Sequence, residues 1–185
     1  MQTRACAMAM LGALCFFSLP VGAGAALPPA VTAVAGALQP RGTGMAAWFG
    51  FKLYDATLWV EPGRRAWPVE EGAIALAITY ARAIAGKQLV DTSIDEMRRL
   101  GLGNEARLDV WRTLLDRALP SVSEGDTLVG LFEPQRGARF WHEGRLTAEV
   151  ADADFARAFF SIWLDDRTRE PQLRAHLLGR QKDSP

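Results

Sequence analysis

Apolar residues near the end of the chain recur at the spacing of an amphipathic helix. They form one face: Phe155, Phe159, Ile162 and Trp163. The Asp165-Asp166 pair ends this helix. Thr168 caps a second helix, whose first turn tolerates Pro171 and which Gly179 ends. We therefore predict two closing helices whose apolar positions serve packing and carry no catalytic motif.

An alternating pattern, typical of β-strands, occupies an earlier part of the chain. It runs from Trp48 to Val60 and is followed by a Pro62-Gly63 turn. A second stretch, Ala73 to Arg82, places large apolar residues on one face and mostly alanine on the other. Small residues on one face indicate a helix packed close to the backbone of this strand.

The period becomes helical in the middle of the chain. One apolar stripe ends at Gly101, and a second begins after Asn104 and ends before Pro120. From Asp126 the strand period returns in three runs, which predict an antiparallel meander over residues 127–133, 138–143 and 146–150. This order of strands, helices, a meander and helices predicts an α+β fold, with helices on one face of a mostly antiparallel sheet.

The first 25 residues have the composition of a secretory signal peptide. Arg4 precedes an apolar run that ends at Pro20, and Ala23-Gly24-Ala25 is a small-residue cleavage site. A membrane anchor needs about 20 apolar residues, and this run is shorter. We therefore expect an exported protein, periplasmic or secreted, without a stable membrane anchor. Residues 26–35 are expected to be a short lead-in to the domain.

Composition narrows the function classes further. Cys6 and Cys15 both lie in the signal, so the mature chain has neither a disulfide nor a cysteine metal ligand. The 21 basic and 21 acidic residues balance, and loss of the signal with its one arginine leaves a net charge of about −1. This balance gives no electrostatic indication of a nucleic-acid partner. The oligomeric state is left open.

Two motifs, one near each end of the predicted domain, point to a known family. The first, from Gly42 to Val60, has the form G-x-G followed by F-K-x-Y-x-x-x-L-W. The second, from Phe159 to Arg174, has the form F-F-x-I-W-L-D followed by T-x-x-P-x-L-R. Together they resemble bacterial chalcone isomerase-like proteins. The resemblance covers residues 36–179, leaves 180–185 as a tail, and implies an open-faced β-sandwich with a ligand cleft between a curved sheet and a helix layer.

The resemblance also shows which catalytic groups are missing. In plant chalcone isomerases an arginine after the paired glycines holds a phenolate, and Ala46 stands at that position here. Tyr54 stands where the family has a threonine of the hydroxyl network. Arg41 is close in sequence, but an odd displacement along a strand points a side chain to the other face. We therefore predict no catalytic residue, and expect Ala46 at the mouth of the cleft beyond the reach of Arg41 and Arg82.

Other chemistries find little support in the sequence. His142 and His176 are the two histidines, and neither has a carboxylate or another partner at ligand spacing, which favours structural roles. Gly42-Thr43-Gly44 lacks the third glycine and the following helix of a phosphate-binding loop. Two pairs of closely spaced aspartates fall at predicted helix ends, where capping accounts for them: Asp152 with Asp154, and Asp165 with Asp166. We predict neither a metal nor a cofactor.

Aromatic residues are more numerous than a small helix layer needs, and an apolar cleft with a few polar anchors is how small-molecule sites are built. As anchors we choose the hydroxyls of Tyr54 and Tyr80 and the guanidinium of Arg82, although Arg82 can instead form an ion pair at the end of its strand. Non-catalytic relatives bind fatty acids. The resemblance therefore implies a periplasmic binder of a small apolar ligand such as a fatty acid.

Two alternatives stay open. The first is an intramolecular lyase or isomerase that acts on an unsaturated, chalcone-like compound, with Tyr54 and Arg82 replacing the missing cation. The second is an interaction module whose exposed aromatic side chains meet a partner in the cell envelope.

Overall fold

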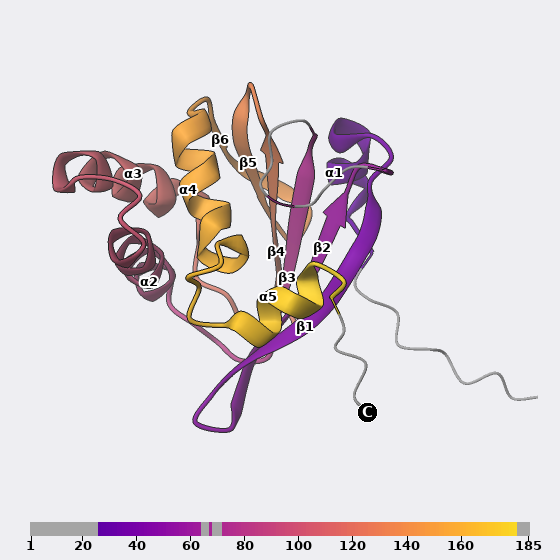
Figure 1. The fold of residues 1–185 in the computed structure, drawn as a ribbon, viewed down its shortest axis with the longest axis horizontal. Helices are drawn as coiled ribbons and strands as arrows, with labels where there is room; N and C mark the ends of the chain where they lie inside the picture. The colour runs from indigo at the N-terminus through magenta and orange to yellow at the C-terminus, as the bar shows by residue number, and fades with distance from the viewer. Residues whose placement is uncertain (1–25, 64–66, 68–71, 181–185) are drawn as a thin grey trace, which may run out of the picture.

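Six strands form one antiparallel sheet in which neighbours in sequence pair with each other throughout (Figure 1). The computed structural model describes residues 26–63, 67 and 72–180. The predicted signal peptide, its cleavage site and most of the predicted tail lie outside the described residues. Across the sheet the strands are β1 (Gln39–Trp48), β2 (Phe51–Val60), β3 (Ile74–Tyr80), β4 (Thr127–Glu133), β5 (Gly137–His142) and β6 (Arg145–Val150).

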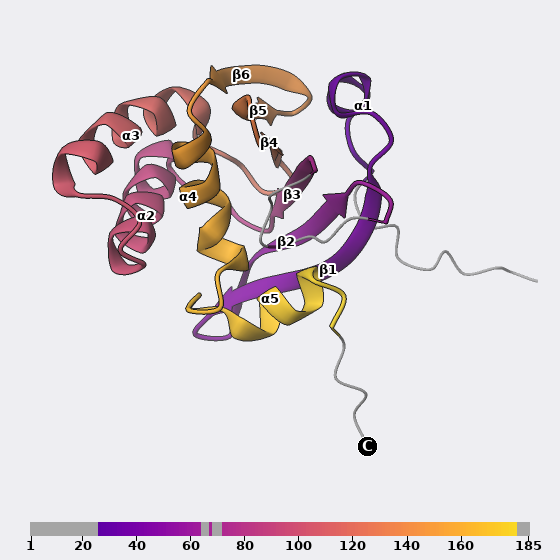
Figure 2. The ribbon, with the colours of Figure 1, turned by 45° about the horizontal axis from the view of Figure 1, so that its top comes forward.

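Four helices cover one face of this curved sheet (Figure 2). They are α2 (Gly86–Arg99), α3 (Glu105–Ala118), α4 (Ala153–Leu164) and α5 (Pro171–Leu177). Aromatic side chains of α4 join the two layers, because Phe159 packs edge-on against Phe140 at 5.0 Å and Phe160 stacks on Phe132 at 5.7 Å. The predicted α+β architecture is confirmed. In the part of the chain that the structure describes, no helix is long and apolar enough to cross a membrane.

The helix ends follow two of the three predicted caps. Asn104 accepts a hydrogen bond from the Arg107 amide at the start of α3, and Asp152 accepts one from the Phe155 amide at the start of α4. The prediction that Thr168 caps α5 is wrong, since α5 begins after Glu170. Thr168 instead donates to the Ile162 carbonyl at 2.8 Å and so fastens the loop before α5 to the end of α4.

The strand predicted from Trp48 is wrong at its start, where the chain makes a hairpin between β1 and β2. Phe49 and Gly50 form a two-residue turn with φ of 47° and 80°. The sequence pattern missed β1 because glycine and proline are disfavoured in strands. Gly42 has a packing role, since a Cβ there would lie 2.0 Å from the His176 carbonyl oxygen. The glycine allows α5 to lie directly on β1.

The other face of the sheet is partly covered by α1 (Pro29–Ala35), which lies within the segment 26–35 predicted as a short lead-in. Val31 of α1 is fully buried in a small apolar cluster with Ala75 and Ala77 of β3. The alanine face of β3 had predicted a closely packed helix, and α1 occupies that place.

Candidate ligand-binding site

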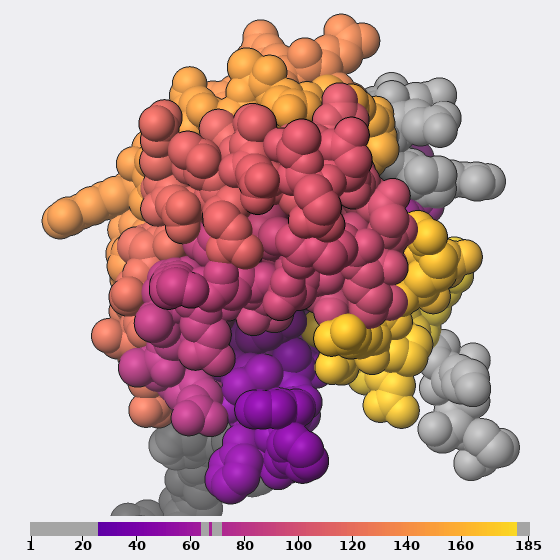
Figure 3. Space-filling view, turned by 90° about the vertical axis from the view of Figure 1, so that its left-hand side faces the viewer, coloured from indigo at the N-terminus to yellow at the C-terminus, as the bar shows by residue number. Residues whose placement is uncertain are grey.

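A cavity of about 500 Å³ lies between the sheet and the helix layer. Its interior is apolar and includes Leu76, Ile78, Leu128, Phe140, Phe159 and Ile162. The exposed members of its lining come from the β1–β2 hairpin, α2 and the loop before α5, and Figure 3 shows a hollow between these elements. We call this space the cleft. Its volume falls within the roughly 300–1,000 Å³ that small-molecule pockets occupy.

Two tyrosine side chains bring the main polar groups of the cleft. Tyr54 of β2 pairs in register with Ala46 of β1 on one side and with Tyr80 of β3 on the other. All three line the cleft, and the two tyrosine rings meet edge-on at 5.9 Å. The cleft thus has a row of one small and two hydroxyl-bearing side chains across three adjacent strands.

The two hydroxyls differ in their partners. Trp163 of α4 donates its indole N–H to the Tyr54 hydroxyl oxygen at 2.9 Å, which leaves the Tyr54 proton free to donate elsewhere. The Tyr80 hydroxyl makes no hydrogen bond to any of the described residues. Each tyrosine can therefore donate one hydrogen bond to a guest in the cleft.

Burial raises the pKa of both hydroxyls further above neutral pH. Loss of hydration raises the pKa of Tyr54 to about 12, opposed by the hydrogen bond from Trp163 and reinforced by the negative charge of Glu170. The pKa of Tyr80 is raised as well, first by burial and then by the neighbouring Tyr54. At neutral pH these groups act as hydrogen-bond donors and not as phenolate bases.

Alkaline pH is expected to destabilise the fold through these two tyrosines, the only two in the chain. A pKa of about 12 in the folded state, against 10.0 for an unperturbed tyrosine, gives stability that is present below pH 10 and lost as the pH rises toward 12. The free energy of unfolding should lose about 2 kcal/mol from Tyr54 by pH 12. Denaturant titrations and tyrosinate absorbance measure this loss, and Tyr54→Phe should reduce it. A native tyrosinate midpoint near 10 for both groups would contradict the burial argument.

Ala46 is on the lining of the cleft and is nearly fully buried. Neither Arg41 nor Arg82 is among the residues that line the cleft. Arg41 donates from Nε to the Leu178 carbonyl at 3.2 Å, beyond the end of α5. Arg82 is exposed and belongs to a shallow depression on the surface, beside Phe51 and Lys52. The structure therefore brings Tyr54 and Tyr80 together but separates Arg82 from them.

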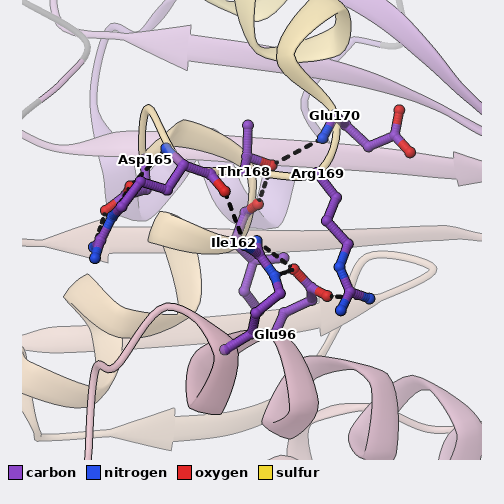
Figure 4. A network of polar contacts seen from close by, with 8 residues as sticks. Glu96, Ile162, Asp165, Thr168, Arg169 and Glu170 are labelled. Carbon is purple, nitrogen blue, oxygen red and sulfur yellow. Dashed lines mark hydrogen bonds and ion pairs between the residues drawn. The ribbon is translucent and has the colours of Figure 1, made fainter.

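A charged network at the edge of the cleft was missed in the sequence. Glu96 of α2 is buried among the lining residues, and its carboxylate accepts two hydrogen bonds from Arg99, at 2.8 and 3.0 Å. Its other oxygen pairs with Arg169 at 2.8 Å (Figure 4). Arg169 is thus a cation on the cleft lining, and it shares the single negative charge of Glu96 with Arg99. The one available signal was the place of Glu96 between Ile94 and Met97 in the apolar stripe of α2.

His142 has a carboxylate partner, contrary to the prediction. Asp126 lies 3.0 Å from His142 Nε2, and a hydrogen bond from the Ser123 amide followed by the contact with His142 lowers the pKa of Asp126. This pair is outside the cleft lining. His176 sits on α5 against Gly44 of β1. Within the described part of the chain, no group of three or more histidine, cysteine, aspartate or glutamate residues is suited to hold a metal ion.

The residues that line the cleft are better suited to ligand binding than to catalysis. The interior of the cleft is apolar, its two tyrosine hydroxyls are neutral donors, and the charges on its lining partly compensate each other. Such a site suits a small, largely apolar molecule.

Comparison with known proteins agrees with this fold. The profile described as chalcone isomerase-like matches residues 21–179. An uncharacterized protein of Haemophilus influenzae is 30% identical over 146 residues, which cover 79% of this chain and 70% of that protein. The crystal structure of a fatty-acid binding protein of Arabidopsis thaliana superposes with a TM-score of 0.60 at 9% identity, over 79% of this chain and 89% of that chain. The chain therefore belongs to the chalcone isomerase-like family.

Proposed function

We propose that this protein binds a small amphiphilic molecule, with a long apolar part and an oxygen acceptor at one end, without catalysing a reaction. A fatty acid is the ligand class that fits best. The observation that carries the proposal is the apolar cleft of about 500 Å³ into which Tyr54 and Tyr80 bring two protonated hydroxyls.

The position of the hydroxyls favours a carboxylic acid. The oxygen of Tyr54 already accepts a hydrogen bond from Trp163, so its remaining proton points to another acceptor. A carboxyl group presents two acceptor oxygens, which matches two adjacent donors. Hydrogen bonds to an ionised carboxylate are stronger than those between neutral groups. The alkyl chain would lie along the apolar interior, where each buried CH₂ contributes about 0.8 kcal/mol.

Two further observations support the proposal. The Arabidopsis fatty-acid binding protein has the same fold, which makes this ligand class compatible with the architecture. The composition of residues 1–25 supports export, and we include a periplasmic location in the proposal.

Native mass spectrometry tests the function directly. Protein purified from the periplasm of the producing cell is expected to carry a bound mass that organic extraction releases as a fatty acid or a similar amphiphile. The delipidated protein should then gain thermal stability on addition of a long-chain fatty acid, as binding to the folded state alone requires. Repeated preparations without bound mass, together with no stabilisation by any fatty acid, would refute the proposal.

The alternative of a lyase or isomerase has lost one of its two chosen groups. Arg82 was to replace the missing cation, and it lies outside the cleft lining. Tyr54, the group that remains, and its neighbour Tyr80 are neutral donors and supply no fixed positive charge to hold a phenolate. Turnover of a panel of chalcone-like substrates above the uncatalysed rate would restore this alternative.

A further inference from the structure

Three aromatic side chains are exposed at the end of the β1–β2 hairpin. Trp48, Phe49 and Phe51 are 66%, 84% and 69% exposed, and the rings of Trp48 and Phe49 lie 5.0 Å apart. We call these three residues the hairpin tip. The hairpin extends beyond the rest of the sheet, so the tip is a projection and not part of a flat face (Figure 1). Clustered exposed apolar groups of this kind mark interaction sites.

The backbone conformation at the hairpin tip is unfavourable for phenylalanine, the residue at position 49. Phe49 has a φ of 47° and Gly50 one of 80°, as in a type I′ turn, where asparagine and glycine are favoured. A bulky residue with positive φ is a strained exception. Among the described residues Phe49 is the most exposed large apolar side chain, so packing within the fold does not compensate this strain. Its side chain is therefore better explained by a contact outside the chain.

The surroundings of the tip indicate the kind of contact. Phe51 shares a surface depression with two basic residues, Lys52 and Arg82. Lys52 also pairs with Asp55, at 2.5 Å. Aromatic rings with basic side chains beside them are typical of segments that lie in the interface of a bilayer. Trp48 belongs both to the tip and to the lining of the cleft.

We propose that the hairpin tip inserts into the interfacial region of a lipid bilayer, with Lys52 and Arg82 at the level of the headgroups. Docking in this way places the mouth of the cleft against the membrane. Exchange of an amphiphilic ligand with the bilayer would then follow from the proposed function, whereas the docking itself does not depend on it.

The size of the tip favours a membrane over a second copy of the chain. Three aromatic side chains bury roughly 450–750 Å² in all. A stable protein interface buries roughly 800 Å² on each partner. The balanced charge of the chain further predicts that apolar burial dominates docking and that long-range attraction contributes little.

Co-sedimentation of the delipidated protein with vesicles of phosphatidylcholine and phosphatidylglycerol tests the proposal. Phe49→Asn is the decisive variant, because asparagine suits the turn while it removes the ring. We expect its membrane partition coefficient to fall about tenfold, while its thermal unfolding midpoint stays equal or rises. Val110→Asn is the matched control, since Val110 is an apolar residue on α3 that is 60% exposed and remote from the hairpin in sequence. It should bind vesicles as the unmodified protein does, also at high salt.

Three results would overturn the proposal: no vesicle binding by the unmodified protein, equal binding by Phe49→Asn, or binding that high salt abolishes. Sedimentation analysis without vesicles adds a fourth, a stable dimer that Phe49→Asn dissociates. Each of these outcomes leaves the mass-spectrometric test of ligand binding unaffected, so failure of the docking proposal is distinguishable from failure of the proposed function.

Discussion

Tyr80→Phe is expected to weaken the binding of a long-chain fatty acid at least tenfold and to leave the free energy of unfolding unchanged or slightly higher. The Tyr80 hydroxyl has no hydrogen-bond partner among the described residues, so its removal leaves none of their groups unsatisfied. A hydrogen bond to a charged acceptor contributes about 1.5–3 kcal/mol. Loss of one such bond therefore reduces affinity by a factor of about ten or more.

Tyr54→Phe is the informative comparison, because the Tyr54 hydroxyl serves both a ligand and Trp163. Its removal leaves the indole N–H of Trp163 without the acceptor that it has at 2.9 Å. We expect this variant to lose affinity to a similar degree and to lose about 1–2 kcal/mol of stability as well.

Isothermal titration of the delipidated variants with one fatty acid, and with the alcohol of the same chain length, measures these effects. The alcohol carries no charge, so its affinity should fall less than that of the acid. Unchanged acid binding in Tyr80→Phe would show that the carboxyl group lies elsewhere in the cleft. Arg169, the arginine on the lining, would be the next group to test.

Ala46→Arg is expected to lower the free energy of unfolding by about 3 kcal/mol without ligand and to recover most of that loss with a saturating fatty acid. Ala46 is 3% exposed and lies in register with Tyr54, so the new guanidinium would enter the cleft beside neutral hydroxyls. An unpaired charge in such surroundings is unfavourable. A bound carboxylate supplies the missing counter-charge, and its affinity should rise.

Ala46→Met separates charge from size in this experiment. Methionine is long but neutral, so it should show the cost of filling the cleft without a recovery specific to the acid. Urea titrations with and without ligand give both quantities. Equal behaviour of the two variants would show that steric crowding alone is at work. Weak cyclisation of a chalcone by Ala46→Arg, absent in Ala46→Met, would show that the scaffold lacks only the cation.

Local patterns in the sequence were sufficient to predict most helices of the helix layer and the strands of the meander. The helical stripe from Phe155 corresponds to α4, and the run over residues 127–133 corresponds to β4 with the same bounds. The caps at Asn104 and Asp152 depend on hydrogen bonds that span three residues, which is why the sequence alone identifies them. The alanine face of β3 indicated a close helix but not which segment would form it.

The β1–β2 hairpin is an element that the local sequence pattern did not predict. The alternation that begins at Trp48 continues across Phe49 and Gly50, yet the backbone reverses there through two positive φ angles. The glycines of β1 give little strand signal of their own. Their role depends on α5, which is distant in sequence and packs directly on them.

Sequence by itself determined the family, the class of fold, the loss of the arginine at Ala46 and the choice of Tyr54 and Tyr80. Only the tertiary structure decided which side chains share the cleft. Tyr54 and Tyr80 lie side by side because β2 and β3 pair in one particular register, and Trp163 of α4, 109 residues away in sequence, donates to Tyr54. Arg82 lies just beyond β3 and is outside the cleft, whereas Glu96 and Arg169 meet at its edge. Periodicity reports the face that a residue occupies, but contacts between layers depend on how the elements pack.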